Sequence, residues 1–211
     1  MITRKTGGKR IRKLKELQRK SLQISERPVI LIVTEGITEE RYFKALRTDL
    51  RINAKVEISK SKYGTDPKSV VEYAKYLSRK EKQYGDIYDK TWCVYDRDEH
   101  QKFKDANIQA RDLKFEVAFS NPCFELWYLI HFQNQEAHIE RDEVVENLKQ
   151  YIPDYDKTKD CYEKLKKYQN DAIVHAEKLR EKHKRENSEE TKNPSTTVDL
   201  LVKYLNSISN S

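Results

Sequence analysis

The chain has 211 residues, of which 36% are charged, and its formal net charge is +7. A chain of this length can bury a hydrophobic core of ordinary size, and one domain with an appendage is the natural expectation. No apolar run approaches the roughly 18 residues of a membrane-spanning helix, and three widely spaced cysteines, Cys93, Cys123 and Cys161, favour a reduced, cytoplasmic protein without a Cys-based metal site.

The positive charge is concentrated in residues 1–27, which we interpret as a basic N-terminal arm. This segment has ten Lys or Arg residues and two Glu, for a net charge of +8, whereas the remaining 184 residues carry a net charge of −1. No apolar segment follows the basic residues, so the pattern is not that of a secretory signal. Such an arm commonly contacts nucleic-acid phosphates, although a solvated tail that only aids solubility explains the same charge.

Residues 28–120 alternate between strand and helix patterns. Short runs of β-branched and aromatic residues predict strands over residues 29–33, 55–59, 91–95 and 115–119. Helical periodicity predicts helices over residues 38–47, 67–83 and 102–113. Thr38 and Asp66 are the expected N-caps of the first two helices. The order β-α-β-α-β-α-β predicts a parallel sheet flanked by helices, and therefore an α/β fold.

Residues 121–211 are predicted to form a helical extension that packs on the sheet. A turn at Asn121-Pro122 precedes an apolar segment, residues 124–132, which predicts a buried helix. Thr196 and Asp199 have capping-box spacing, which predicts a last helix of about ten residues. Further helices are predicted over residues 141–150, 159–167 and 172–184, followed by a polar loop over residues 186–192.

Acidic residues follow two of the predicted strands. Glu35 comes directly after the first strand, and Asp96 and Asp98 come directly after the third. Ligands bind at the carboxyl ends of the strands in such sheets, where these carboxylates would repel one another without a cation. Mg²⁺ prefers oxygen ligands, and metal ions held by carboxylates support phosphodiester cleavage. The pattern predicts a Mg²⁺ or Mn²⁺ site at Glu35, Asp96 and Asp98, although water-facing acids at strand ends are also common.

Other polar residues allow two interpretations each. Glu125 lies inside the apolar segment, where a buried carboxylate requires a partner or a cation. It is either a fourth catalytic residue or a helix N-terminal residue whose charge is favourable there. His100 could contact phosphate and His131 could transfer a proton, but His131 is equally consistent with a hydrogen-bonded core residue.

The two acidic motifs resemble the Toprim signature of primases, topoisomerases and several nucleases. The matching segments are residues 33–43 (VTEGITEERYF) and residues 94–100 (VYDRDEH). The resemblance makes Glu35 the Toprim glutamate, and it makes Asp96 and Asp98 the Asp-x-Asp pair. The glycine-rich turns of primases are absent, which speaks against primer synthesis.

A narrower resemblance, to the RloB family, covers most of the chain outside the arm. It rests on residues 120–127 (SNPCFELW), 131–132 (HF) and 193–197 (NPSTT). The resemblance implies a Toprim-like fold and a Mg²⁺-dependent nuclease, and it leaves open whether the substrate is DNA, transfer RNA or another RNA. RloB-like proteins are encoded beside restriction systems or with an ABC-type ATPase called RloA. A role in anti-phage defence by abortive infection, controlled by that ATPase, is therefore expected. A non-catalytic Toprim-like binding or regulatory module is the alternative, and phosphoryl or nucleotidyl transfer is a third possibility.

Overall fold

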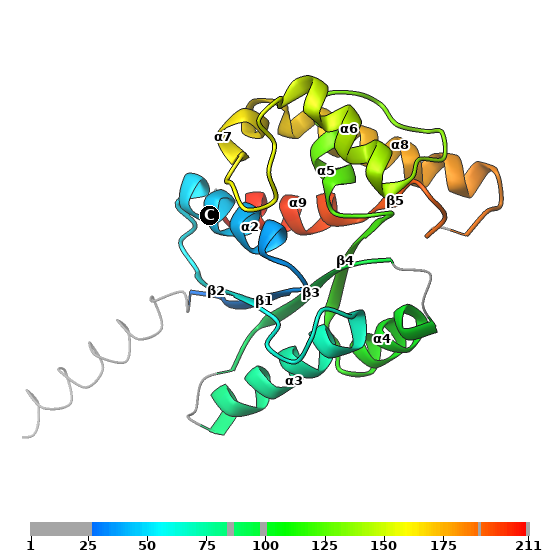
Figure 1. Cartoon of the computed structure of the whole chain (residues 1–211). Helices are drawn as coiled ribbons and strands as arrows, with labels where there is room; N and C mark the ends of the chain where they lie inside the picture. The colour runs from blue at the N-terminus through cyan, green and yellow to red at the C-terminus, as the bar shows by residue number, and fades with distance from the viewer. Residues whose placement is uncertain (1–26, 84–86, 98–100, 190, 210–211) are drawn as a thin grey trace, which may run out of the picture.

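The computed structural model describes residues 27–83, 87–97, 101–189 and 191–209. Its centre is a five-stranded sheet with the strand order β2-β1-β3-β4-β5 (Figure 1). Four strands are parallel, and β5 at one edge is antiparallel to β4. The strands are β1 (Val29–Thr34), β2 (Lys55–Lys60), β3 (Lys90–Asp96), β4 (Glu116–Asn121) and β5 (Ser195–Thr196).

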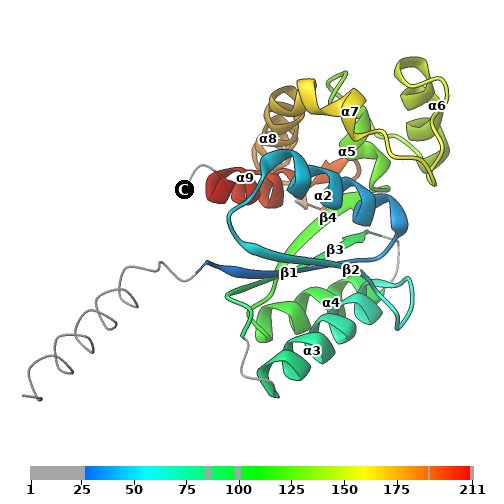
Figure 2. The same cartoon turned by 90° about the vertical axis from the view of Figure 1, so that its left-hand side faces the viewer.

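Helices cover both faces of the sheet. Helices α2 and α9 lie on one face, α3 and α4 lie on the other, and α6, α7 and α8 lie beyond α2 and α9 (Figures 1 and 2). The parallel strands are connected by α2 (Ile37–Leu50), α3 (Pro67–Gln83) and α4 (Gln101–Asp112). The elements after β4 are α5 (Glu125–Leu129), α6 (Arg141–Tyr151), α7 (Tyr162–Leu165), the 3-10 helix η1 (Lys166–Tyr168), α8 (Gln169–Arg185) and α9 (Val198–Ser209).

The hydrophobic core forms two clusters, one on each face of the sheet. Successive strand side chains point to opposite faces, so Ile30 and Ile32 pack under α2 and α9, whereas Leu31 and Val33 pack on α3 and α4. The first cluster also contains side chains from α5 to α8. The helical second half of the chain therefore packs on the sheet, and the predicted α/β fold with a helical C-terminal part is confirmed.

The connections place a topological switch point between β1 and β3. These two strands are neighbours in the sheet, but the helix after β1 lies on one face and the helix after β3 lies on the other (Figure 2). In open α/β sheets, ligands bind in the crevice that forms at such a point, at the carboxyl ends of the strands. The residues that follow β1 and β3 are therefore the first place to search for a site.

Most predicted elements are present, but some caps and helix lengths were predicted wrongly. All four predicted strands are present, with ends within two residues of the prediction. Gly36, and not Thr38, is the N-cap of α2. The Asp66 cap is confirmed, since Asp66 Oδ1 accepts a hydrogen bond from the Ser69 backbone amide at 3.2 Å. Residues 124–132 are buried as expected, but only Glu125–Leu129 is α-helical.

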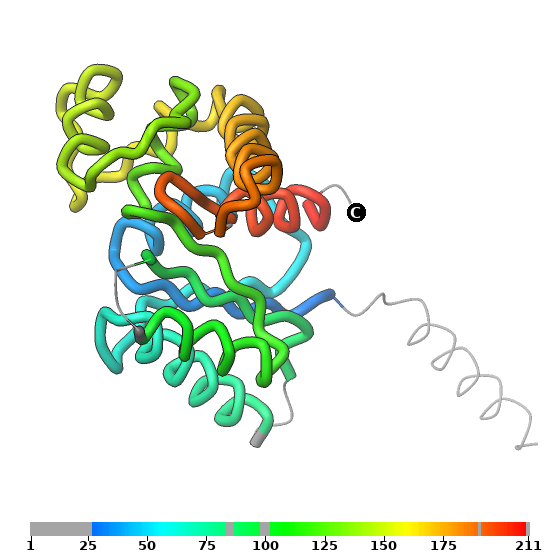
Figure 3. The backbone as a smooth tube through the Cα atoms, turned by 90° about the vertical axis from the view of Figure 1, so that its right-hand side faces the viewer, coloured from blue at the N-terminus to red at the C-terminus, as the bar shows by residue number. Residues whose placement is uncertain are grey.

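The edge strand β5 was not predicted. Ser195 and Thr196 pair with Asn121 and Ser120 of β4, although Thr196 was expected to cap the last helix. In Figure 3 the orange segment that leads into α9 runs beside β4. The predicted capping box is wrong, because α9 begins at Val198 and the Asp199 side chain is fully buried in an ion pair with Arg180.

Two further predictions concern the basic N-terminal arm and the absence of a membrane-spanning helix. Residues 1–26 of the predicted arm lie outside the described residues. Within the described ranges, no helix is both long enough and apolar enough to cross a bilayer.

Candidate active site at the switch point

Glu35 and Asp96 meet at the carboxyl edge of the sheet. Glu35 directly follows β1, and its backbone amide donates a hydrogen bond to the Val94 carbonyl of β3 at 2.9 Å. Its side-chain Oε2 accepts a hydrogen bond from the backbone amide of Asp96 at 3.1 Å. The structure thus brings together two of the residues that the sequence assigned to a site. The third, Asp98, lies outside the described residues.

A further carboxylate, Glu39, lies at the same place. It is in the first turn of α2, and it is only 5% exposed. A Cβ atom at Gly36 would lie 2.6 Å from Glu39 Oε2, so the glycine leaves the space that this carboxylate occupies. An acidic residue in the first turn of a helix is favourable there for electrostatic reasons alone, so the sequence pattern does not assign Glu39 to a site.

Burial and neighbouring negative charges raise the pKa values of Glu39 and Asp96. Burial raises the pKa of Glu39 to about 7, and the charge on Glu125 adds to the effect while backbone hydrogen bonds oppose it. The pKa of Asp96 lies well above its usual range because the side chain is buried and because Glu39 and Glu35 are close. Neighbouring negative charges of this kind favour either protonation or a bound cation.

Glu125 belongs to the same electrostatic cluster but has partners of its own. It is 3% exposed at the start of α5. Its Oε1 accepts a hydrogen bond from Tyr155 Oη at 2.9 Å and lies 3.3 Å from Lys157 Nζ. Burial alone would raise its pKa, but Lys157 and these hydrogen bonds lower it. Glu125 is therefore an ionised carboxylate held by partners, and its charge reaches both Glu39 and Asp96.

Two carboxylate oxygens of this cluster fit a cation. Glu39 Oε2 and Asp96 Oδ1 are buried and have no hydrogen-bond partner within the part of the chain that the structure describes. Buried acceptors without partners are costly, and a divalent cation would satisfy them and relieve the repulsion. However, no group of three or more His, Cys, Asp or Glu side chains among the described residues is arranged to hold a metal ion. The described carboxylates alone therefore do not form a complete metal site.

Arg141 provides a positive charge at this edge. It is the first residue of α6, and its Nη2 lies 3.4 Å from Asp96 Oδ2 and donates a hydrogen bond to the Pro122 carbonyl at 3.1 Å. Its charge opposes the upward shift of the Asp96 pKa. Sequence reasoning missed Arg141, since a basic residue in the predicted helix over residues 141–150 carries no signal of its own.

The remaining sequence candidates lie elsewhere. His131 is buried in the core, where its Nδ1 lies 2.7 Å from the Trp127 carbonyl and its ring packs against the Trp127 and Tyr42 rings. Burial lowers its pKa to about 4, which suits the core interpretation. His100 lies outside the described residues.

The segments that resemble the RloB family meet beside Asp96. Ser120 pairs with Asp96 on one side, in β3, and with Thr196 on the other side, in β5. The Ser120 and Thr196 hydroxyl groups lie 3.0 Å apart, and Asn121 Nδ2 donates a hydrogen bond to the Thr191 carbonyl at 2.7 Å. Two segments about 70 residues apart in the sequence are thus joined next to the acidic cluster.

Comparisons with known proteins identify the family of the chain. Searches of curated proteins and of solved structures found no match. A family model described as RloB-like protein matches residues 30–205, which include the whole acidic cluster and both segments that meet beside it. The chain therefore belongs to the RloB-like family.

Proposed function

We propose that this protein is a Mg²⁺- or Mn²⁺-dependent nuclease of the Toprim type, which cleaves DNA or RNA phosphodiesters in anti-phage defence. The main support is the convergence of Glu35, Glu39 and Asp96 at the switch point of the sheet. The defence role rests on the resemblance to RloB proteins.

Each side chain has a distinct part in this proposal. Glu35, Glu39 and Asp96, together with Asp98, would hold the metal. A bound Mg²⁺ would neutralise charge that develops on the phosphate and lower the pKa of a bound water. Glu35 also fixes the end of β3 through its hydrogen bond to the Asp96 amide. Glu125, kept ionised by Lys157 and Tyr155, adds negative potential that favours a cation at Glu39 and Asp96.

Incubation of the purified protein with DNA and RNA pools tests the proposal. Cleavage should require Mg²⁺ or Mn²⁺, and Asp96→Asn should abolish it while the melting temperature shows a folded protein. Glu146→Gln is the matched control, because Glu146 is an exposed carboxylate on α6. Cleavage that continues unchanged in Asp96→Asn would reject the site. Extension of an oligonucleotide in the presence of nucleoside triphosphates would instead favour nucleotidyl transfer.

The second candidate is a non-catalytic binding or regulatory module. It is favoured by the contact between Arg141 Nη2 and Asp96 Oδ2 at 3.4 Å, because a guanidinium group can neutralise this carboxylate without a metal ion. A module of this kind would bind nucleic acid or a partner with the same affinity in EDTA and in Mg²⁺, and it would cleave nothing.

We also propose that an ABC-type ATPase controls the protein. This part rests on the family resemblance, and on the argument that an unrestrained nuclease would damage its own cell. Co-expression with a genomically adjacent ATPase should yield a complex whose nuclease activity depends on ATP. Full activity of the isolated protein, with no complex formed, would contradict it.

A further inference from the structure

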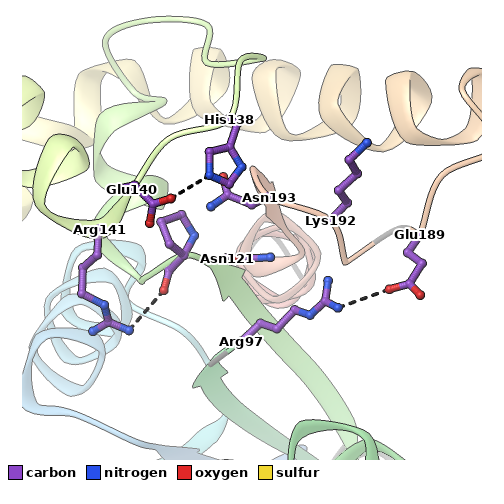
Figure 4. A pocket seen from close by; sticks show the side chains of 9 residues that line it. Arg97, Asn121, His138, Glu140, Arg141, Glu189, Lys192 and Asn193 are labelled. Atoms are coloured by element: carbon purple, nitrogen blue, oxygen red, sulfur yellow. Dashed lines mark hydrogen bonds and ion pairs between the residues drawn. The ribbon is translucent and has the colours of Figure 1, made fainter. Parts of the chain in front are cut away.

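A pocket lies next to the acidic cluster. Its volume is about 740 Å³, within the range of about 300–1,000 Å³ that is usual for small-ligand sites. Asn121 and Pro122 line it at the end of β4, Arg141 lines it at the start of α6, and Lys192 and Asn193 line it before β5 (Figure 4). Because Arg141 also contacts Asp96, the pocket adjoins the candidate active site.

Positive charge predominates among the side chains of the pocket. Arg97, Arg141 and Lys192 are basic, whereas Glu140 and Glu189 are acidic. Arg97 directly follows Asp96 in the chain, and Arg141 contacts Asp96 from α6. Arg141 is therefore beside the place where a scissile phosphate would bind, whereas the Arg97 side chain extends toward Glu189 on the other side of the pocket (Figure 4).

The position of Arg141 is not explained by helix stability. Positive charge at a helix N-terminus opposes the helix dipole, which favours acidic residues such as Asp142 and Glu143 in the same turn. The side chain reaches back to Asp96 and the Pro122 carbonyl and remains 43% exposed. A guanidinium group in this position can contact a phosphate without leaving the pocket.

Glu189 is held by a largely exposed ion pair, whereas Glu140 pairs with His138 and also caps the N-terminus of α6. Arg97 Nη2 lies 3.2 Å from Glu189 Oε2, and the Glu189 side chain is 70% exposed. Exposed ion pairs contribute about 0–1 kcal/mol, so an incoming phosphate can replace Glu189 at low cost. Guanidinium groups form paired hydrogen bonds to phosphate, which favours the replacement of Glu189 by a phosphate at Arg97. The Lys192 side chain is exposed and makes no hydrogen bond or ion pair within the described part of the chain.

We propose that this pocket binds the segment of a nucleic-acid strand next to the scissile phosphodiester, with Arg97, Arg141 and Lys192 contacting phosphate groups of that strand. The assignment of the ligand to a nucleic-acid strand rests on the proposed nuclease function. The chemistry of the pocket, namely recognition of phosphate groups by guanidinium and ammonium groups, does not depend on cleavage.

Binding of a short fluorescent single-stranded oligonucleotide, measured in EDTA with the full chain, tests the pocket without metal or cleavage. Lys192→Gln and Arg141→Gln should each weaken binding about tenfold and lower the slope of log affinity against log salt by about one. Arg97 is left intact because its side chain also binds the Thr191 carbonyl. Lys149→Gln removes an exposed charge from the far end of α6 and should leave the affinity unchanged. Melting temperatures confirm that each variant is folded.

Unchanged affinity in both pocket variants would overturn the proposal, and so would an equal loss in Lys149→Gln. Competition by a mononucleotide as effective as competition by unlabelled oligonucleotide would overturn the assignment to a strand. Cleavage is measured separately with the unchanged protein in Mg²⁺. If pocket variants bind weakly and the unchanged protein does not cleave, the nuclease proposal fails and the pocket stands. If the unchanged protein cleaves and the pocket variants bind normally, only the pocket fails.

Discussion

The carboxylate of Glu35 accepts a hydrogen bond from the backbone amide of Asp96, with Oε2 and N 3.1 Å apart. This contact joins residues 61 positions apart and ties the end of β1 to the end of β3. It fixes the Glu35 side chain at the switch point, beside a second carboxylate whose pKa is raised by burial and by its acidic neighbours. The bond therefore organises the acidic cluster as well as connecting two strands.

Glu35→Gln separates the effect of the Glu35 charge from the effect of its hydrogen bond to the Asp96 amide. The amide oxygen of Gln can still accept the hydrogen bond from the Asp96 amide, but the negative charge is lost. We expect metal-dependent cleavage to fall about 100-fold or more, with little change in melting temperature. Glu35→Ala should lower both the rate of cleavage and the melting temperature, since it removes the hydrogen bond as well as the charge. Cleavage assays and calorimetric Mn²⁺ titrations on the two variants measure the difference, and normal Mn²⁺ affinity in Glu35→Gln would contradict the assigned role.

The strand pattern of the sequence was sufficient to place Glu35 and Asp96 at one edge of a parallel sheet. It could not identify Glu39, because a glutamate in the first turn of a helix is favourable there for electrostatic reasons alone. Only the fold shows that the Glu39 side chain turns into the space above Gly36. Arg141 is 45 residues from Asp96, so no local pattern could connect the two. The two-residue strand β5 was also beyond prediction, because its pairing with β4 depends on long-range contacts.

Glu39→Gln should change how the stability of the metal-free protein depends on pH. The pKa of Glu39 is about 7 in the folded protein and 4.5 as a reference for the unfolded chain. Between these values the unfolded chain releases the proton while the folded protein retains it, so stability falls as pH rises through this window. The loss is of the order of 3 kcal/mol, and Glu39→Gln should remove much of it. Urea unfolding in EDTA at pH 5 and pH 8 measures how the free energy of unfolding changes with pH in the unchanged protein and in Glu39→Gln. Equal pH dependence in the two proteins would show that Glu39 is not the titrating group.

Asp199 should contribute strongly to stability. It is fully buried, with its two oxygens 2.6 and 2.7 Å from the guanidinium nitrogens of Arg180 and one oxygen 3.0 Å from Lys203 Nζ. Removal of one partner from a buried ion pair costs about 3–5 kcal/mol, so Asp199→Ala should lower the free energy of unfolding by about that amount. Glu40→Ala, which breaks the more exposed pair with Lys44, is the comparison and should cost less than about 1 kcal/mol. Similar losses in both variants would show that the buried ion pair contributes no more to the free energy of unfolding than the more exposed pair.

Deletion of residues 1–27 tests the basic arm, whose net charge of +8 is known from the sequence. Lys and Arg side chains that neutralise phosphates release counterions, so affinity for nucleic acid should fall and depend less on salt after deletion. Mn²⁺ affinity should stay the same, because no residue of the acidic cluster is removed. If deletion instead reduces complex formation with an ATPase and leaves nucleic-acid binding intact, the arm contacts the partner. No change in either binding curve would support the alternative interpretation, that the arm is a solvated tail.

The decrease in the free energy of unfolding below pH 6.5 should depend in part on His131. Burial lowers the pKa of this side chain to about 4, against 6.5 as a reference for the unfolded chain. As pH falls below 6.5, the unfolded chain takes up a proton that the folded protein does not bind, so stability is lost progressively until pH reaches about 4. The loss from this one group is of the order of 3 kcal/mol. His131→Asn does not titrate in this range, and its amide group can still donate a hydrogen bond to the Trp127 carbonyl. Since the substitution also changes core packing, the slope of unfolding free energy between pH 7 and pH 4 is the quantity to compare. A shallower slope in the variant is expected, and an equal slope would mean that His131 is already protonated in the folded protein or that other groups dominate acid unfolding.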